Sequence, residues 1–115
     1  MSKPTIYHNA RCSKSRQTLA LLEENGVEAD VVEYLNDMPN KATLKSIIAA
    51  LGVSPHDIVR TKEAQYQEAG LTKNSSDADV LSALIKFPKL LERPIVVNGK
   101  KAAIGRPPEN VLDIL

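Results

Sequence analysis

Cys12 is the only cysteine of the chain, and the residues around it are of the kinds that activate a thiol. Arg11, Lys14 and Arg16 bring positive charge close to the sulfur, and a nearby cation favours thiolate over thiol. Ser15 stands three residues further on, from where its hydroxyl can reach back and hydrogen-bond the thiolate. A lone cysteine is more often a small buried core residue. Because charged and hydroxylic neighbours are not typical of a core, we predict that Cys12 is a catalytic nucleophile supported by Ser15 and Arg16.

The chain offers this thiol no internal partner. A dithiol cycle needs a second cysteine to resolve the mixed disulfide, and Cys12 has none within one monomer. Catalysis through Cys12 therefore requires an external thiol such as glutathione to complete each turnover. We expect glutathione as a co-substrate and no bound cofactor.

The composition is typical of a soluble protein of a single domain, residues 1–115. The 15 basic and 14 acidic side chains give a net charge of +1, so no global field favours nucleic acid or an anionic membrane. No segment has the length of a signal peptide's apolar run or of a membrane span, and neither nucleic acid nor membrane is expected as a partner. One cysteine excludes an internal disulfide framework, which favours a reducing, cytoplasmic location. One cysteine and two distant histidines, His8 and His56, do not match zinc-ligand spacing, so no metal is predicted and His56 is interpreted as solvated.

The elements that must position Cys12 begin with a strand, a helix and a strand. Residues 5–7 predict a short strand, and a helix is expected from about Ser13 to Asn25, with a glycine directly after it. Residues 27–34 predict a second strand because they are rich in β-prone side chains. This βαβ order implies parallel strands. It places Cys12 at the start of the helix, where unpaired backbone N–H groups add to the activation of the thiol.

The middle of the chain is predicted to be helical. Apolar residues recur with helical spacing over 43–51, and residues 62–69 predict another helix. A short helix is expected between them, from Ser54 toward Arg60, and a further one begins at Ser76. The residues of this last helix predicted to face the core are Val80, Leu81, Leu84 and Ile85.

The β signal returns toward the C-terminus. Residues 94–97 and 102–104 predict a hairpin that turns at Asn98 and Gly99, and a last helix follows. The apolar residues carried by this helix are Val111, Leu112 and Leu115. With a helical cluster at about 40–92 set aside, the element order is βαβ–ββα. We therefore predict an α/β protein with a thioredoxin-like fold and an inserted helical cluster.

Several segments resemble the signatures of a known family. Residues 5–16 (TIYHNARCSKSR) resemble the nucleophile segment of the ArsC-type arsenate reductases that depend on glutathione and glutaredoxin. Residues 90–97 (LLERPIVV) resemble the second signature of this family, and residues 105–107 (GRP) with 111–115 (VLDIL) resemble the third. These segments occur in the family's order and span essentially the whole chain, which is more specific than a Cys-x-x-Ser pattern alone.

The resemblance implies a thioredoxin-like fold with a helical insertion and an oxidoreductase that acts in arsenical detoxification. In such enzymes the cysteine thiolate attacks arsenate and forms a covalent thiol–arsenate adduct. Glutathione then attacks, glutaredoxin accepts the resulting mixed disulfide, and arsenite is released. The implied partners are arsenate or a similar oxyanion, glutathione and glutaredoxin.

Three arginines of the family carry over to Arg60, Arg93 and Arg106 as ligands of the oxyanion. Guanidinium groups bind such anions through paired, charge-assisted hydrogen bonds. Arg93 and Arg106 each precede a proline, which holds their backbone extended. Pro94 is similar to the cis-proline beside the active cysteine of thioredoxin-like folds, which would bring Arg93 near the thiol. His8 also matches a family position, and in its protonated form it would lower the pKa of the thiol further; the alternative is a strand-end histidine bonded to backbone.

Two departures from the typical family pattern lie beside the thiol. Ala10 stands where many members have proline, and Ser13 with Lys14 replaces a Gly-Thr pair. Both departures leave the identity of the physiological oxyanion open.

Two other functions also stay open. One is a general glutathione-linked monothiol oxidoreductase, for which the three arginines would be dispensable. The other is a regulator resembling Spx, an ArsC-fold adaptor that binds RNA polymerase, although this chain lacks the Cys-x-x-Cys pair that such proteins commonly use.

Overall fold

The computed structural model describes residues 3–115, so Met1 and Ser2, the first residues of the predicted domain, lie outside the description. The chain divides into two compact units. The sheet unit combines the chain up to Asp37 with Arg93–Leu115, and the helical unit consists of Met38–Glu92. That both belong to one domain stays a prediction. None of the helices within residues 3–115 is both long and apolar enough to cross a membrane.

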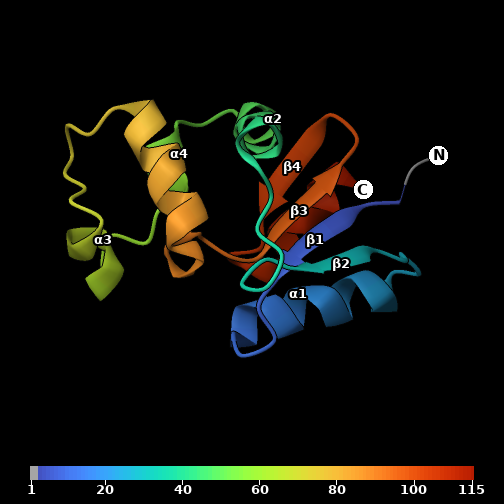
Figure 1. The fold of residues 1–115 in the computed structure, drawn as a ribbon. Coiled ribbons are helices and arrows are strands. Elements are labelled where there is room, and N and C mark those ends of the chain that lie inside the picture. Colours follow the sequence, from blue (N-terminus) through green and yellow to red (C-terminus); the bar gives the residue numbers. More distant parts are fainter. Residues whose placement is uncertain (1–2) are drawn as a thin grey trace. The chain divides into compact units, whose positions relative to one another are not determined.

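The sheet unit is built on four strands, drawn as arrows in Figure 1. They are β1 (Thr5–His8), β2 (Asp30–Glu33), β3 (Ile95–Asn98) and β4 (Lys101–Ile104). Their order across the sheet is β2-β1-β3-β4. Strand β1 runs parallel to β2 and antiparallel to β3, and β3 pairs antiparallel with β4. The predicted βαβ–ββα order and the parallel first pair are thereby confirmed.

One face of this sheet carries the helical segments of the same unit, α1 (Ser13–Glu24) and the 3-10 helix η3 (Pro108–Ile114). Ile6 of β1 lies opposite Val96 of β3, and both pack with Leu22 of α1 and Val111 of η3 in one buried cluster. Burial of such aliphatic side chains supplies about 25 cal/mol per Å² of apolar surface removed from water. The cluster therefore fixes α1, whose N-terminus carries Cys12, against the central strands.

The helical unit contains α2 (Lys41–Leu51), η1 (Pro55–Ile58), α3 (Ala64–Glu68), α4 (Asp77–Lys86) and η2 (Pro88–Leu90). Specific caps mark the ends of two of these helices. The Ser76 hydroxyl accepts a hydrogen bond from the Asp79 N–H (3.2 Å) at the start of α4. Gly52 ends α2 in the left-handed conformation at φ 71°, which favours glycine. The predicted helices of this region are confirmed, with shorter bounds for some of them.

Two expectations about burial and strand length were wrong. Ile85 is 37% exposed, whereas Ala83 of the same helix is buried. Strand β2 begins at Asp30 rather than at residue 27. The reason is that the Val27 N–H donates to the Leu22 carbonyl (2.9 Å), which makes Val27 part of the C-terminal cap of α1.

The C-terminal region also differs from the prediction in detail. Asn98 pairs with Lys101 and belongs to β3, so the hairpin turns at Gly99 and Lys100. The Asn98 side chain donates to the Ile114 carbonyl (2.7 Å), which fastens the end of η3 to the hairpin. The last helix is of the 3-10 type. Of the three apolar residues assigned to this helix from the sequence, Val111 is buried, whereas Leu112 and Leu115 are exposed.

Candidate active site

Cys12 occupies the N-cap of α1, with an extended backbone (φ −91°, ψ 123°). Its carbonyl accepts the first helical hydrogen bond, from the Arg16 N–H (3.0 Å), and its own N–H donates to the Asn9 carbonyl (3.0 Å). The loop between β1 and α1 is braced by the Arg16 guanidinium, which donates to the Ala10 carbonyl (2.8 Å). Arg16 therefore holds the loop that presents the thiol.

The sulfur of Cys12 is surrounded by groups that stabilise negative charge. Burial raises the pKa of Cys12, but four other contributions outweigh it and hold this pKa below its ordinary value. These are the backbone N–H of Ser15, the charge of Arg93, the backbone N–H of Lys14 and the charge of Arg106. The activation expected from the start of a helix thus acts together with two arginines that lie far away in the sequence.

Ser15 contributes differently from the expectation. Its hydroxyl is fully buried, lies 2.6 Å from Nδ1 of His8, and accepts a hydrogen bond from the Asn9 N–H (3.0 Å). The hydroxyl is therefore engaged by the end of β1, and Ser15 acts on the Cys12 sulfur through its backbone N–H.

His8 is buried at the end of β1, with only 6% of its surface exposed. Burial lowers its pKa, the Glu33 carboxylate opposes this effect, and the Arg16 charge adds to it; the net pKa lies below the ordinary value of 6.5. The neutral imidazole therefore predominates at neutral pH, which does not favour the imidazolium role that the sequence suggested. A neutral Nδ1 can accept the Ser15 hydroxyl proton, because that oxygen already accepts from Asn9.

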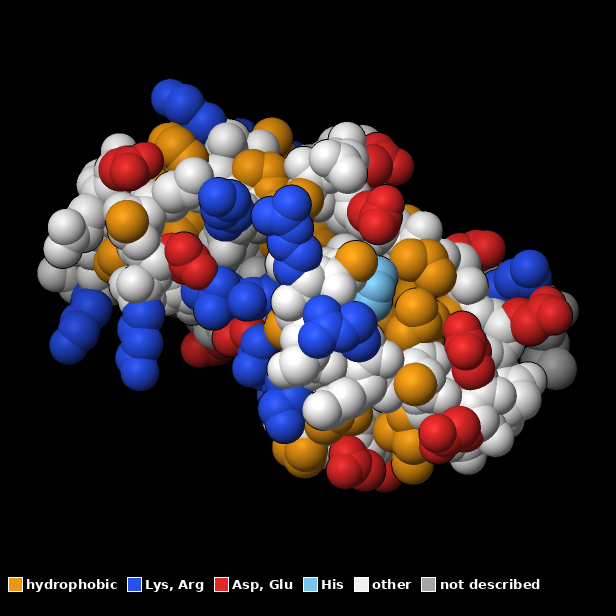
Figure 2. Space-filling model, turned by 90° about the horizontal axis from the view of Figure 1, so that it is seen from below, with side chains coloured by type: hydrophobic (Ala, Val, Ile, Leu, Met, Phe, Trp, Pro, Cys, Tyr) orange, Lys and Arg blue, Asp and Glu red, His pale blue; other side chains and the backbone are white. Residues whose placement is uncertain are grey.

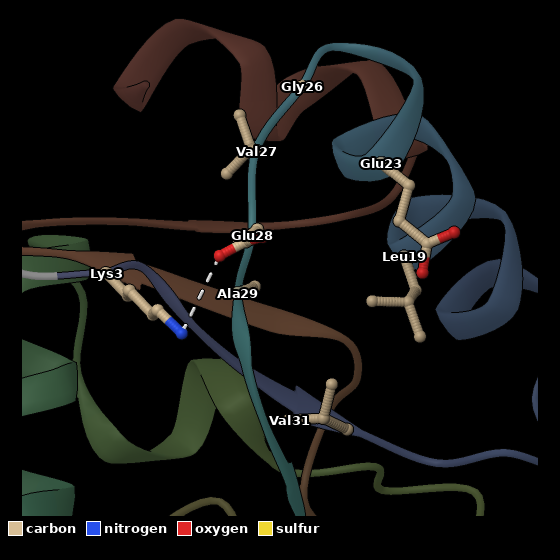
Figure 3. Close-up of a pocket in the computed structure, with 8 residues that line it drawn as sticks. All are labelled: Lys3, Leu19, Glu23, Gly26, Val27, Glu28, Ala29 and Val31. Carbon is tan, nitrogen blue, oxygen red and sulfur yellow. Dashed lines mark ion pairs between the residues drawn. The ribbon is translucent and has the colours of Figure 1, made fainter.

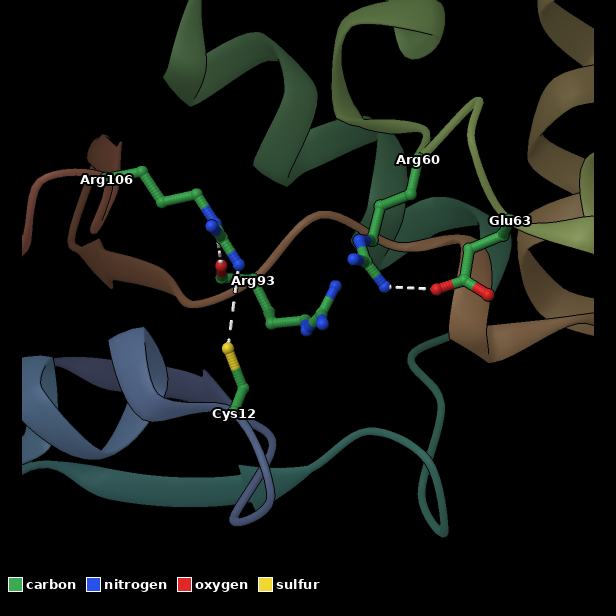
Figure 4. Close-up of polar contacts among 5 residues, drawn as sticks. All are labelled: Cys12, Arg60, Glu63, Arg93 and Arg106. Carbon is green, nitrogen blue, oxygen red and sulfur yellow. Dashed lines mark hydrogen bonds and ion pairs between the residues drawn. The ribbon is translucent and has the colours of Figure 1, made fainter.

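Arg106 and Arg93 lie beside the thiol in the sheet unit (Figure 4). Nη2 of Arg106 donates to Sγ of Cys12 over 3.5 Å, and its Nε donates to the Arg93 carbonyl (2.8 Å). The Arg93–Pro94 peptide bond is cis, as the sequence suggested, and so is the Arg106–Pro107 bond, which was not predicted. Two guanidinium groups and a thiol thus converge from three segments of the chain.

Arg60 belongs to the helical unit, where the structure shows its local partners. Its backbone N–H donates to the Leu90 carbonyl (2.7 Å), and its guanidinium forms an ion pair with Glu63, drawn as a dashed line in Figure 4. This ion pair was not predicted, although an acid three residues after an arginine is a typical ion-pair spacing. A contact of Arg60 with the oxyanion stays a prediction.

Sequence reasoning also missed Asn9, which ties the loop before the thiol together. Its carbonyl accepts from the Cys12 N–H, its N–H donates to the Ser15 hydroxyl, and its side-chain oxygen accepts from the Arg11 N–H (3.0 Å). Asparagine is favoured in turns because its side chain bonds to backbone two residues on. An Asn directly after a strand and three residues before the nucleophile was the available signal.

Other polar features of the described residues do not form a second site of this kind. His56 is partly exposed and its Nε2 lies 2.9 Å from the Thr72 carbonyl. No group of three or more His, Cys, Asp or Glu side chains within residues 3–115 could hold a metal ion.

A surface pocket lies between the end of α1 and β2 (Figure 3), where Lys3 and Glu28 form an exposed ion pair (3.8 Å). Basic and acidic side chains both occur on the face shown in Figure 2, in keeping with the small net charge.

The fold and the site together define a thioredoxin-like α/β protein with a single activated thiol at a helix N-cap. Comparison with known proteins agrees with this class: the ArsC family matches residues 7–114. An arsenate reductase of Neisseria meningitidis is 47% identical over 117 residues, covering 100% of both chains. The uncharacterized protein YfgD of Escherichia coli is 52% identical over 112 residues, covering 96% of this chain and 94% of that protein. The solved arsenate reductase of Vibrio cholerae superposes with a TM-score of 0.94 at 45% identity, covering 98% of each chain. The chain belongs to the ArsC family.

Proposed function

We propose that this protein is an arsenate reductase that uses Cys12 as its nucleophile. The observation that carries the proposal is the hydrogen bond from Nη2 of Arg106 to Sγ of Cys12 (3.5 Å), at a thiol whose pKa is lowered by its surroundings. A guanidinium at this distance from the nucleophile can hold an oxyanion against the attacking sulfur. The relatives named as arsenate reductases supply the identity of the anion.

The arginines supply the affinity for the oxyanion. Arg106 and Arg93 come from the two loops that flank the β3–β4 hairpin, and each carries a fork of donors suited to a tetrahedral oxyanion. Arg60 adds a third guanidinium in this proposal. Their positive charge also stabilises the negative charge that moves onto the oxyanion as sulfur attacks.

The chemistry needs two thiols, of which this chain supplies one. The Cys12 thiolate attacks arsenic(V) and an S–As bond forms. The As–O bond of one hydroxyl breaks, and that hydroxyl takes a proton from solvent and leaves as water. Glutathione thiolate then attacks the Cys12 sulfur, and the electron pair of the S–As bond passes to arsenic, which leaves as arsenite. The Cys12–glutathione disulfide is reduced when a glutaredoxin thiolate takes over the glutathione. Two thiols are oxidised to one disulfide while arsenic(V) gains two electrons.

A coupled assay tests this function. Arsenate is offered with glutathione, glutaredoxin, glutathione reductase and NADPH, and NADPH oxidation is followed for the wild type and for Cys12→Ser. We expect arsenate-dependent oxidation that the Cys12→Ser variant lacks. A wild-type rate no higher than the Cys12→Ser background would contradict the proposal. Turnover only with thioredoxin, thioredoxin reductase and NADPH would retain the reductase and overturn the glutathione-linked part.

A general glutathione-linked monothiol oxidoreductase is the second candidate, favoured by the lowered pKa of Cys12, which suffices for disulfide exchange without an oxyanion. Under this function Arg106→Ala would retain turnover of a small glutathione mixed disulfide. Under the leading proposal the same variant loses arsenate turnover. Measuring both substrates on one variant separates the two functions.

A further inference from the structure

The segment that carries Arg106 is packed against its neighbours more closely than a side chain would allow. Gly105 directly follows β4, is buried, and donates its N–H to the Pro94 carbonyl (2.9 Å). A Cβ atom built on Gly105 would lie 2.8 Å from Cγ of Pro94, 3.1 Å from Cγ2 of Thr18, and closer still to Oγ1 of Thr18. Real Cβ atoms essentially never come as close as the contacts with Pro94 and with Oγ1 of Thr18, so any residue larger than glycine requires this segment to shift.

The atoms around Gly105 have little freedom to retreat. Thr18 is fully buried in α1, and its hydroxyl donates to the Lys14 carbonyl (2.8 Å), which holds its rotamer. Pro94 is buried as well, and its ring has no rotatable side chain. A methyl group on Gly105 would therefore displace the backbone after β4 rather than its neighbours.

Each of the three residues in this contact belongs to a segment that carries a residue of the candidate site. Thr18 lies on the helix that Cys12 caps, Pro94 follows Arg93, and Gly105 precedes Arg106. The contact thus joins the three segments that bring the thiol and two guanidinium groups together.

We propose that Gly105 is a positioning residue, whose close contact with Thr18 and Pro94 sets the distance between the Arg106 guanidinium and the Cys12 sulfur. The hydrogen bond from Nη2 to Sγ spans 3.5 Å, so a displacement of Arg106 away from the sulfur weakens it. Misplacement by about 1 Å can lower activity by about a hundredfold. The consequence for oxyanion binding rests on the proposed function, whereas the consequence for the thiol does not.

Gly105→Ala tests this proposal, with Gly26→Ala as the matched control. Gly26 has a positive φ of 72°, and no atom lies within 4 Å of the place that a Cβ would take, so its alanine variant is strained by backbone conformation alone and far from the Arg106 contact. We expect both variants to lower the melting temperature. Only Gly105→Ala is expected to move the midpoint of the pH profile of Cys12 alkylation by iodoacetamide upward, in the direction of Arg106→Ala, by about half a pH unit.

A second pair of variants keeps the test decisive if Gly105→Ala folds poorly. Thr18→Ala removes two of the three close atoms, so the Gly105→Ala/Thr18→Ala double variant is expected to recover part of the wild-type profile. An alkylation profile of Gly105→Ala identical to wild type, beside a shifted Arg106→Ala, would overturn the positioning role. A double variant shifted as far as Arg106→Ala would also overturn it. Alkylation needs no arsenate, so this result is independent of whether arsenate is turned over. In the coupled assay a displaced Arg106 raises the KM for arsenate by about tenfold, and Gly26→Ala leaves it unchanged.

Discussion

The Arg106 guanidinium lies 3.5 Å from the sulfur of Cys12, although the two residues are 94 positions apart in the sequence. The β3–β4 hairpin and the Gly105 contact carry Arg106 back to the first helix, where the Arg93 carbonyl also accepts a hydrogen bond from it. A cation at this distance stabilises the thiolate and can bind an oxyanion beside it.

Arg106→Ala is expected to lower kcat/KM for arsenate by about a hundredfold, the typical loss on removing one donor from a site of developing negative charge. The measurement is steady-state kinetics in the coupled assay. Lys100→Ala, which removes a positive charge from the exposed hairpin turn, is the control and is expected to behave as wild type. Equal losses in the two variants would show a general charge effect and contradict a direct role for Arg106.

Ser15→Ala is expected to destabilise the fold by about 1–3 kcal/mol, because it leaves the Asn9 N–H and Nδ1 of His8 without their buried partner. Urea unfolding followed by circular dichroism measures the loss. Ser46→Ala is the matched control, since Ser46 is exposed on α2 and only donates to the Ala42 carbonyl (3.2 Å). A change within about 0.5 kcal/mol for both variants would contradict the buried network.

The lowered pKa of His8 makes stability depend on pH. Below its ordinary value of 6.5 the unfolded chain takes up a proton that the folded protein resists, so stability falls as the pH drops from 6.5 toward the folded pKa. His8→Gln removes this contribution. We expect the melting temperature of the wild type to fall more between pH 7 and pH 5 than that of His8→Gln. Parallel slopes for wild type and His8→Gln would contradict a buried neutral His8.

Glu63→Gln is expected to lower the KM for arsenate several-fold and to leave kcat unchanged. In the proposed function Arg60 binds the oxyanion, and the Glu63 carboxylate that now pairs with it competes for the same guanidinium. Glu68→Gln, an exposed residue of α3, is the control. An unchanged KM in Glu63→Gln would count against Arg60 as a ligand of the anion.

Local signals predicted most of the elements. Gly52 and Ser76 mark helix ends through conformation and capping, which depend only on nearby residues. The N-cap position of Cys12 followed in the same way, from a strand that gives way to a helix. Strand β2 was predicted too long because the Val27 N–H hydrogen-bonds to the end of α1. The strand propensity of Val27 does not report such a contact.

The site was less predictable because its contacts join distant segments. Residue types suggested that Ser15 bonds the thiolate, whereas the fold brings His8 and Asn9 to its hydroxyl. Burial then decides the charge of His8, and burial is a property of the folded chain. The choice of Arg106 among fifteen basic residues came from the family resemblance, and its hydrogen bond to Cys12 was visible only in the structure.

The proposed chemistry depends most directly on a lowered pKa of the Cys12 thiol. The rate of its alkylation by iodoacetamide, measured against pH on the folded wild-type protein, reports the pKa of this thiol because only the thiolate reacts. Mass spectrometry confirms a single modification, since the chain has one cysteine. The structure predicts a midpoint below the ordinary thiol value of about 8.5. A midpoint at or above that value would contradict the account.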